Sequence, residues 1–150
     1  MSDETEKERL NRELIELLNE LRVALPGVQV LFAFLLAVPF QARFGETTSF
    51  QRDLYFAGLA LALIATAFLI APTAVHRLNF RVHDKEAIVL ISNKLVIVGT
   101  GFLALAMISV TALITDLLFG TAATIVVSLL SAMLFALLWV VLPLSRRVRP

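Results

Sequence analysis

The chain contains no cysteine among its 150 residues, and this absence removes several kinds of chemistry. Without a thiol the chain forms no disulfide, no thiolate metal site and no covalent intermediate on cysteine. Catalytic motifs are missing too: the sequence has no glycine-rich phosphate loop, no H-E-x-x-H zinc motif and no serine nucleophile elbow. We therefore predict that the protein is not an enzyme and that it uses no cofactor.

Charge is scarce as well, since Asp, Glu, Lys and Arg make up 17% of the residues and hydrophobic residues 59%. A soluble domain is about half apolar. Crossing a bilayer core of about 30 Å takes about 20 apolar helical residues, and a backbone in lipid must satisfy its own hydrogen bonds. Four runs are near or above that length, which predicts an all-α integral membrane four-helix bundle: Val23–Phe40, Leu54–Val75, Ala87–Thr115 and Leu117–Leu144.

The charges that are present predict the topology. Ten Lys and Arg residues lie in the N-terminal segment, the second connection and the tail. Only Arg43 and Arg52 lie in the first connection, Gln41–Asp53, and none lies in the third, Thr115–Phe119. Basic residues favour the cytoplasmic side, so we expect a multi-pass protein of the cytoplasmic (inner) membrane with both termini in the cytoplasm. The densely charged start is unlike a signal peptide, and the first apolar run is expected to be a retained span.

The first 22 residues predict a cytoplasmic amphipathic helix. Thr5 and Glu8 fit a capping box, and leucines then recur at steps of four and three. Seven acids against four bases make this segment acidic, which favours packing on another helix over lying on an anionic membrane surface. The stripe consists of Leu10, Leu14, Leu17 and Leu21.

The predicted organisation is a helix at residues 1–22, a four-span domain at residues 23–144 and a basic tail at residues 145–150. Pro26 lies just after the first boundary. Either the helix breaks near Leu25, or Pro26 is the first residue of the first span, where its missing N–H costs nothing. The second interpretation is favoured.

Lys94 is the most informative polar residue of the spans, with Ser92 and Asn93 beside it. A charge inside the membrane marks function, although Lys94 at the inner boundary would instead extend its ammonium to the headgroups. Gln29 lies at a similar depth and could bond Asn93 or Lys94 across helices. The full candidate cluster comprises Glu20, Arg22, Gln29, His76, Arg77, Ser92, Asn93 and Lys94. No metal site is predicted, because His76, His83 and Asp84 fit no zinc spacing.

Small residues recur every four positions on two spans and indicate close helix packing. The sequence leaves open whether these faces close the bundle within one chain or join two chains. The second span has Gly58, Ala62 and Thr66, and the fourth has Gly120, Thr124, Ser128, Ala132 and Ala136.

Several segments between Glu13 and Asn93 carry a family resemblance, among them E16-L-L-N-E-L-R, P39-F, F50-Q-R-D-L-Y and A71-P-T-A-V-H-R. In these the chain resembles an uncharacterised bacterial family of small four-span membrane proteins, which has no established activity. The resemblance implies that a set of polar residues belongs to the family's recurring pattern: Glu20, Arg22, Gln29, Arg43, His76, Arg77 and Asn93.

The expected function is that of a non-enzymatic accessory or scaffold protein that acts by helix–helix association in the lipid bilayer. Its partner would be a second copy or another membrane protein, and no nucleic acid is involved. The alternative is a small oligomeric channel or transporter, with a polar path through Gln29, Asn93 and Lys94 that requires several copies.

Overall fold

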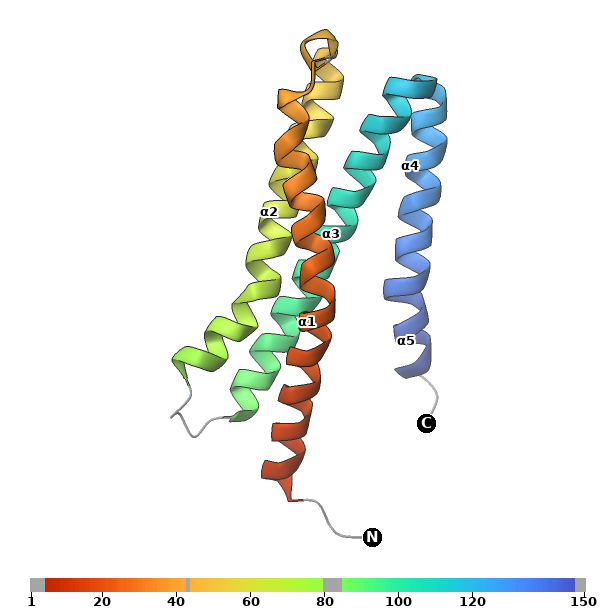
Figure 1. Ribbon diagram of the computed structural model, residues 1–150. Coiled ribbons are helices and arrows are strands. Elements are labelled where there is room, and N and C mark those ends of the chain that lie inside the picture. The colour runs from red at the N-terminus through yellow and green to blue at the C-terminus, as the bar shows by residue number, and fades with distance from the viewer. Residues whose placement is uncertain (1–4, 43, 80–84, 148–150) are drawn as a thin grey trace. The chain divides into compact units, whose positions relative to one another are not determined.

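The computed structural model describes residues 5–42, 44–79 and 85–147, and almost all of these residues are helical (Figure 1). Three long helices come first: α1 (Glu6–Ala37), α2 (Ser49–Leu78) and α3 (Lys85–Phe119). Two short 3-10 turns, Val38–Phe40 and Phe44–Glu46, connect α1 to α2. The last span consists of α4 (Thr121–Ala136), a π-helical turn at Leu137–Val141 and α5 (Leu142–Arg147).

Among the described residues, four helical segments are long and apolar enough to cross a membrane, and their most apolar stretches have a mean hydropathy between 2.2 and 2.8. The predicted all-α, four-span class is therefore confirmed. The segments are Glu8–Phe40, Ser49–Leu78, Glu86–Phe119 and Thr121–Ser145.

The predicted third connection was wrong, because Thr115–Phe119 is the last part of α3 and only Gly120 separates α3 from α4. The predicted first connection was too long, since α2 already begins at Ser49. The reason is a capping box: the Thr48 N–H donates to Gln51 Oε1 (3.0 Å), and the Gln51 N–H donates to Thr48 Oγ1 (3.2 Å). At the capping box that the sequence predicts, Glu8 Oε2 accepts from the Thr5 N–H at 2.9 Å.

The chain forms two compact units, of which the first comprises residues 1–34 and 62–103. Its core contains Leu21 and Val28 of α1 and Leu69 of α2, all at most 3% exposed. Leu17, Leu25, Val96 and Leu103 pack against them. Leu17 and Leu21 of the leucine stripe thus pack on helices of their own chain.

Both interpretations of Pro26 were wrong, because α1 continues through it without a break. An interior proline costs about 3 kcal/mol. Leu14 and Leu21 before it and Val28 after it are buried at seven-residue intervals on one face, whereas Pro26 itself is exposed. Packing of this face on both sides of Pro26 offsets the cost and keeps the helix continuous.

A glycine sets the distance between α2 and α3 in the first unit. A Cβ on Gly99 would lie 2.9 Å from Leu69 Cγ and 3.0 Å from Phe68 Cβ. Beside this approach the rings of Phe68 and Phe102 stack with centroids 5.7 Å apart. Residue 99 must therefore lack a side chain for the two helices to pack as they do.

The second unit comprises residues 35–61 and 104–150. In it α2 and α3 also approach at a glycine, because a Cβ on Gly58 would lie 3.0 Å from Val110 Cγ2. The Ser109 hydroxyl donates to the Leu54 carbonyl of α2 at 2.8 Å. The small residue at position 58 thus lets a serine of one helix reach the backbone of the other.

Tyr55 hydrogen-bonds to a backbone carbonyl one turn before Pro39. A proline at position 39 has no N–H to donate to the Leu35 carbonyl four residues earlier. The Tyr55 hydroxyl donates to that carbonyl at 3.1 Å, and both Leu35 and Tyr55 are buried. The Phe44 ring packs edge-on against Tyr55 at 5.2 Å. Tyr55 thus satisfies the backbone acceptor that Pro39 leaves open.

Replacing Tyr55 with phenylalanine is expected to lower the free energy of unfolding by about 1–2 kcal/mol, because the buried Leu35 carbonyl loses its donor. Unfolding in mixed micelles, followed by circular dichroism, measures the change. Phe56→Tyr is the control, because Phe56 is exposed and its new hydroxyl is expected to have little effect. Equal stability of Tyr55→Phe and wild type would show that this hydrogen bond is unimportant.

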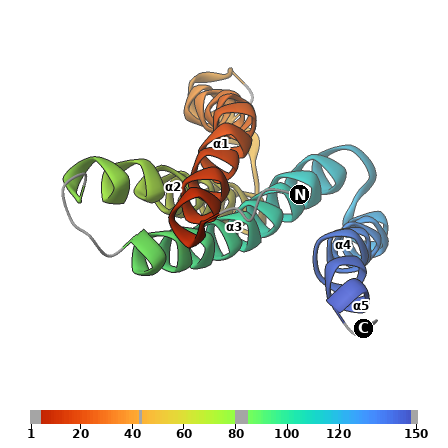
Figure 2. The ribbon, with the colours of Figure 1, turned by 90° about the horizontal axis from the view of Figure 1, so that it is seen from below.

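Near the end of the last span a proline changes the helix type. The Leu142 N–H bonds to the Leu137 carbonyl, five residues back, in the π-helical turn just before Pro143. A π turn is wider than an α turn and relieves the clash between a proline and the preceding turn. The span therefore continues along one axis into α5 (Figure 2).

Candidate functional site

The polar residues that the structure does bring together lie at the helix ends of the second unit, around Asp116. Gln51 Nε2 donates to Asp116 Oδ2 at 2.9 Å. Thr121 and Thr124 Oγ1 lie 3.4 and 3.5 Å from Asp116 Oδ1. Gln51 and Thr124 are buried and Asp116 is half-buried. One carboxylate thus joins the start of α2, the end of α3 and the start of α4.

Local sequence explains this arrangement. Gly120 adopts φ +80°, a conformation that favours glycine. Its N–H bonds to the Asp116 carbonyl and its own carbonyl accepts from Thr124 N–H, both at 3.2 Å. The one-residue connection at Gly120 therefore places the first turn of α4 close to Asp116. The Thr48–Gln51 capping box fixes the amide of Gln51, so that Nε2 points to the carboxylate.

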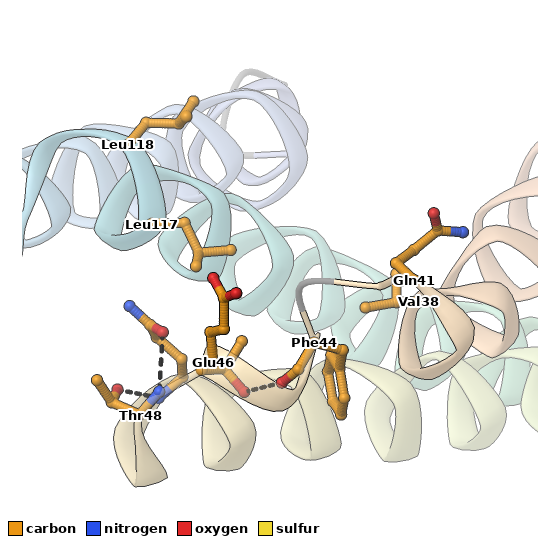
Figure 3. Close-up of a pocket in the computed structure, with 9 residues that line it drawn as sticks. Val38, Gln41, Phe44, Glu46, Thr48, Leu117 and Leu118 are labelled. Atoms are coloured by element: carbon orange, nitrogen blue, oxygen red, sulfur yellow. Dashed lines mark hydrogen bonds between the residues drawn. The ribbon is translucent and has the colours of Figure 1, made fainter.

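Beside this cluster, within the same unit, lies a pocket of about 510 Å³ (Figure 3). Its residues come from the end of the first span, the connection to α2, the start of α2 and the end of α3. The apolar wall consists of Val38, Phe44, Leu117 and Leu118, and the polar wall of Gln41, Glu46, Thr47, Thr48 and Gln51.

The predicted polar cluster falls in the first unit, and its members mostly point outward. Glu20, Arg22, Gln29, Arg77, Asn93 and Lys94 are exposed, and His76 is half-buried. The structure shows no hydrogen bond from Gln29 to Asn93 or Lys94. Within one chain, hydrogen bonds between these residues therefore do not form the polar path that the channel alternative requires. The channel alternative stays a prediction. Arg43, Arg81, His83, Asp84 and Arg149 lie outside the described residues.

Ser92 is the exception in that cluster, because it is fully buried. Its Oγ has no hydrogen-bond partner within the described part of the chain. Pro72 of α2 is likewise fully buried. Among the described residues no group of three His, Asp or Glu side chains could hold a metal ion.

The two stripes of small residues differ in burial. On α2, Gly58 and Ala62 are buried, and the Thr66 hydroxyl bonds back to the Ala62 carbonyl at 2.7 Å. On the last span Thr124 is buried, Gly120 and Ser128 are half-buried, and Ala132 and Ala136 are exposed. A helix turns about 100° per residue, so each four-residue step rotates the stripe by about 40°. Ala132 and Ala136, at the end of the stripe, therefore lie on a different side of the helix from the buried Thr124.

Sequence reasoning placed Asp116 in an outer turn and gave no role to Gln51. The signal that would have found Gln51 is T-x-x-Q at residues 48–51, a capping box that starts a helix earlier than the apolar run does. Gly99 was also missed, because it is not part of a four-residue repeat with other small residues.

Four membrane-span helices and a site built at helix ends define a multi-pass helical membrane protein. Residues 3–143 match the model of a family of unknown function, DUF6328, and the chain belongs to this family. The match extends the resemblance seen between Glu13 and Asn93 over nearly the whole chain. No curated protein and no solved structure matches the chain.

Proposed function

We propose that the protein is a non-enzymatic accessory or scaffold protein of the bacterial cytoplasmic membrane, which acts by helix–helix association through its last span. Ten Lys and Arg residues on one predicted side against two on the other support an orientation with both termini in the cytoplasm.

Burial of the last span carries this proposal. In the most apolar stretch of α2 and α3, 28% and 33% of the residues are buried, against 0% in the most apolar stretch of the last span. The long aliphatic side chains on this span suit lipid. Serine hydroxyls are less suited to lipid. Ser128 and Ser131 are half-buried, and their hydroxyls have no hydrogen-bond partner in the part of the chain that is described. Membrane helices associate through small residues such as serine on one face, because these allow close approach and hydrogen-bond across helices.

The cysteine-free sequence makes a site-specific crosslinking test direct, because an introduced cysteine is the only thiol. Ser131→Cys, labelled with a maleimide–benzophenone and irradiated in native membranes, is expected to give a protein adduct at several times the background yield. The mass of the adduct then shows whether the partner is a second copy or a different protein.

The control is Leu63→Cys, since Leu63 is an exposed apolar residue of α2 outside the small-residue face. It is expected to label lipid and give little protein adduct. Equal adduct yields at the two positions, or monomer alone at Ser131→Cys, would contradict association through the last span.

A further inference from the structure

Gln29 is a polar residue well inside the apolar run of α1. Arg22 is the last charged residue before the run Val23–Phe40, and Gln29 follows it by seven residues, about 10 Å at helical rise. Beyond Gln29 the run continues to Phe40 at the other end of the span. A glutamine side chain is shorter than either distance, so its amide does not reach the headgroups and lies in the hydrocarbon core.

The amide of Gln29 has no partner in its own chain. The residue is exposed, and its side chain has no hydrogen bond within the described residues. An amide carries two N–H donors and an acceptor oxygen, and lipid tails pair with none of these groups. An unpaired amide in hydrocarbon is costly, so the outer side of α1 requires a polar partner from another chain at the depth of Gln29.

The neighbours of Gln29 allow another helix to approach it. At about 100° per residue, Ala33 lies about 40° and Pro26 about 60° around the helix from Gln29. Both are exposed and compact. The buried face of α1, with Leu21, Val28 and Leu35, points elsewhere and packs inside the chain. A second helix can therefore contact the amide without any change in the core.

We propose that this face of α1, Pro26, Gln29 and Ala33, associates with the same face of a second copy, and that the two Gln29 amides hydrogen-bond to each other. An amide is self-complementary, because the N–H of each donates to the oxygen of the other. The bias of basic residues gives every copy the same orientation. The α1 helix of a second copy thus runs parallel to the first and carries its Gln29 at the same depth, which an unrelated protein does not ensure.

Single-cysteine crosslinking in native membranes tests the proposal, because the chain has no cysteine of its own. Ala33→Cys, oxidised with copper–phenanthroline, is expected to give a reducible product of twice the mass of the chain. Adding Gln29→Leu is expected to lower the yield about fivefold, the effect of losing an interhelical hydrogen bond in a membrane. Gln29→Asn keeps the amide and is expected to retain more dimer than Gln29→Leu. Gln29 is exposed, so neither change disturbs the core.

Phe34→Cys is the matched control, because Phe34 is exposed at nearly the same depth but lies about 140° around the helix from Gln29. It is expected to give little dimer. Equal dimer yields from Ala33→Cys and Phe34→Cys, or a yield that Gln29→Leu leaves unchanged, would overturn the proposal. A crosslinked product of another mass at Ala33→Cys would also overturn it, because a different protein then covers this face. None of these results depends on crosslinking from Ser131→Cys, so failure here is distinguishable from failure of association through the last span.

Discussion

Replacing Gly99 with leucine is expected to lower the free energy of unfolding by about 3 kcal/mol, at the upper end of the cost of overpacking a core. Even a Cβ at this position would lie 2.9 Å from Leu69 Cγ and 3.0 Å from Phe68 Cβ. A leucine must therefore push α2 and α3 apart or displace Leu69, which is 2% exposed in the core of the first unit. Unfolding in mixed detergent micelles measures the change.

Gly101→Leu provides a control of the same chemistry two residues away. Nothing lies within 4 Å of a Cβ at Gly101, and the residue is exposed. Because glycine is about 1 kcal/mol worse than leucine inside a helix, this variant is expected to be as stable as wild type or more so. A Gly99→Leu variant as stable as Gly101→Leu would show that α2 and α3 do not pack closely at this position.

Replacing Asp116 with leucine is expected to lower the free energy of unfolding by about 2–3 kcal/mol, because a buried amide then has no acceptor. Gln51 is only 9% exposed, and its Nε2 donates to Asp116 Oδ2 at 2.9 Å. Thr121 and Thr124 lose the same carboxylate. The change is measured by unfolding in mixed micelles, with Asp53→Leu as the control at an exposed acid near the same helix ends.

The double variant sharpens this test. When Gln51 and Asp116 are both replaced with leucine, no buried amide is left without a partner, so the loss is expected to be smaller than the sum of the two single losses. Additive losses, or an Asp116→Leu variant no less stable than Asp53→Leu, would show that the carboxylate does not hold the helix ends together.

Hydropathy was sufficient to predict the four spans, because a backbone in lipid has few options besides the helix. Boundaries depended on shorter signals. The start of α2 is set by Thr48 and Gln51 and not by the first apolar residue. The continuity of α1 through Pro26 depends on Leu21 and Val28 packing on other helices, which no local pattern at the proline reveals.

The candidate site was harder to predict than the spans. Gln29 and Lys94 attract attention as polar residues in apolar surroundings, yet both are exposed. Gln51 and Asp116 are 65 positions apart and meet only because two helices end together. Likewise, Tyr55 compensates for Pro39 through the Leu35 carbonyl, a pairing that requires the backbone of one helix and the side chain of another.

The one-residue connection at Gly120 has a consequence for how the protein enters the membrane. A connection this short gives α3 and the last span no separate loop to be carried across the bilayer, so the two must insert together as a helical hairpin. In the proposed orientation, with both termini in the cytoplasm, the group that crosses with the tip of the hairpin is Asp116, whose charge is costly in hydrocarbon. Thr121 and Thr124 are next to it in the same hairpin, so the hairpin itself supplies hydroxyl donors to the carboxylate, independently of Gln51 of α2.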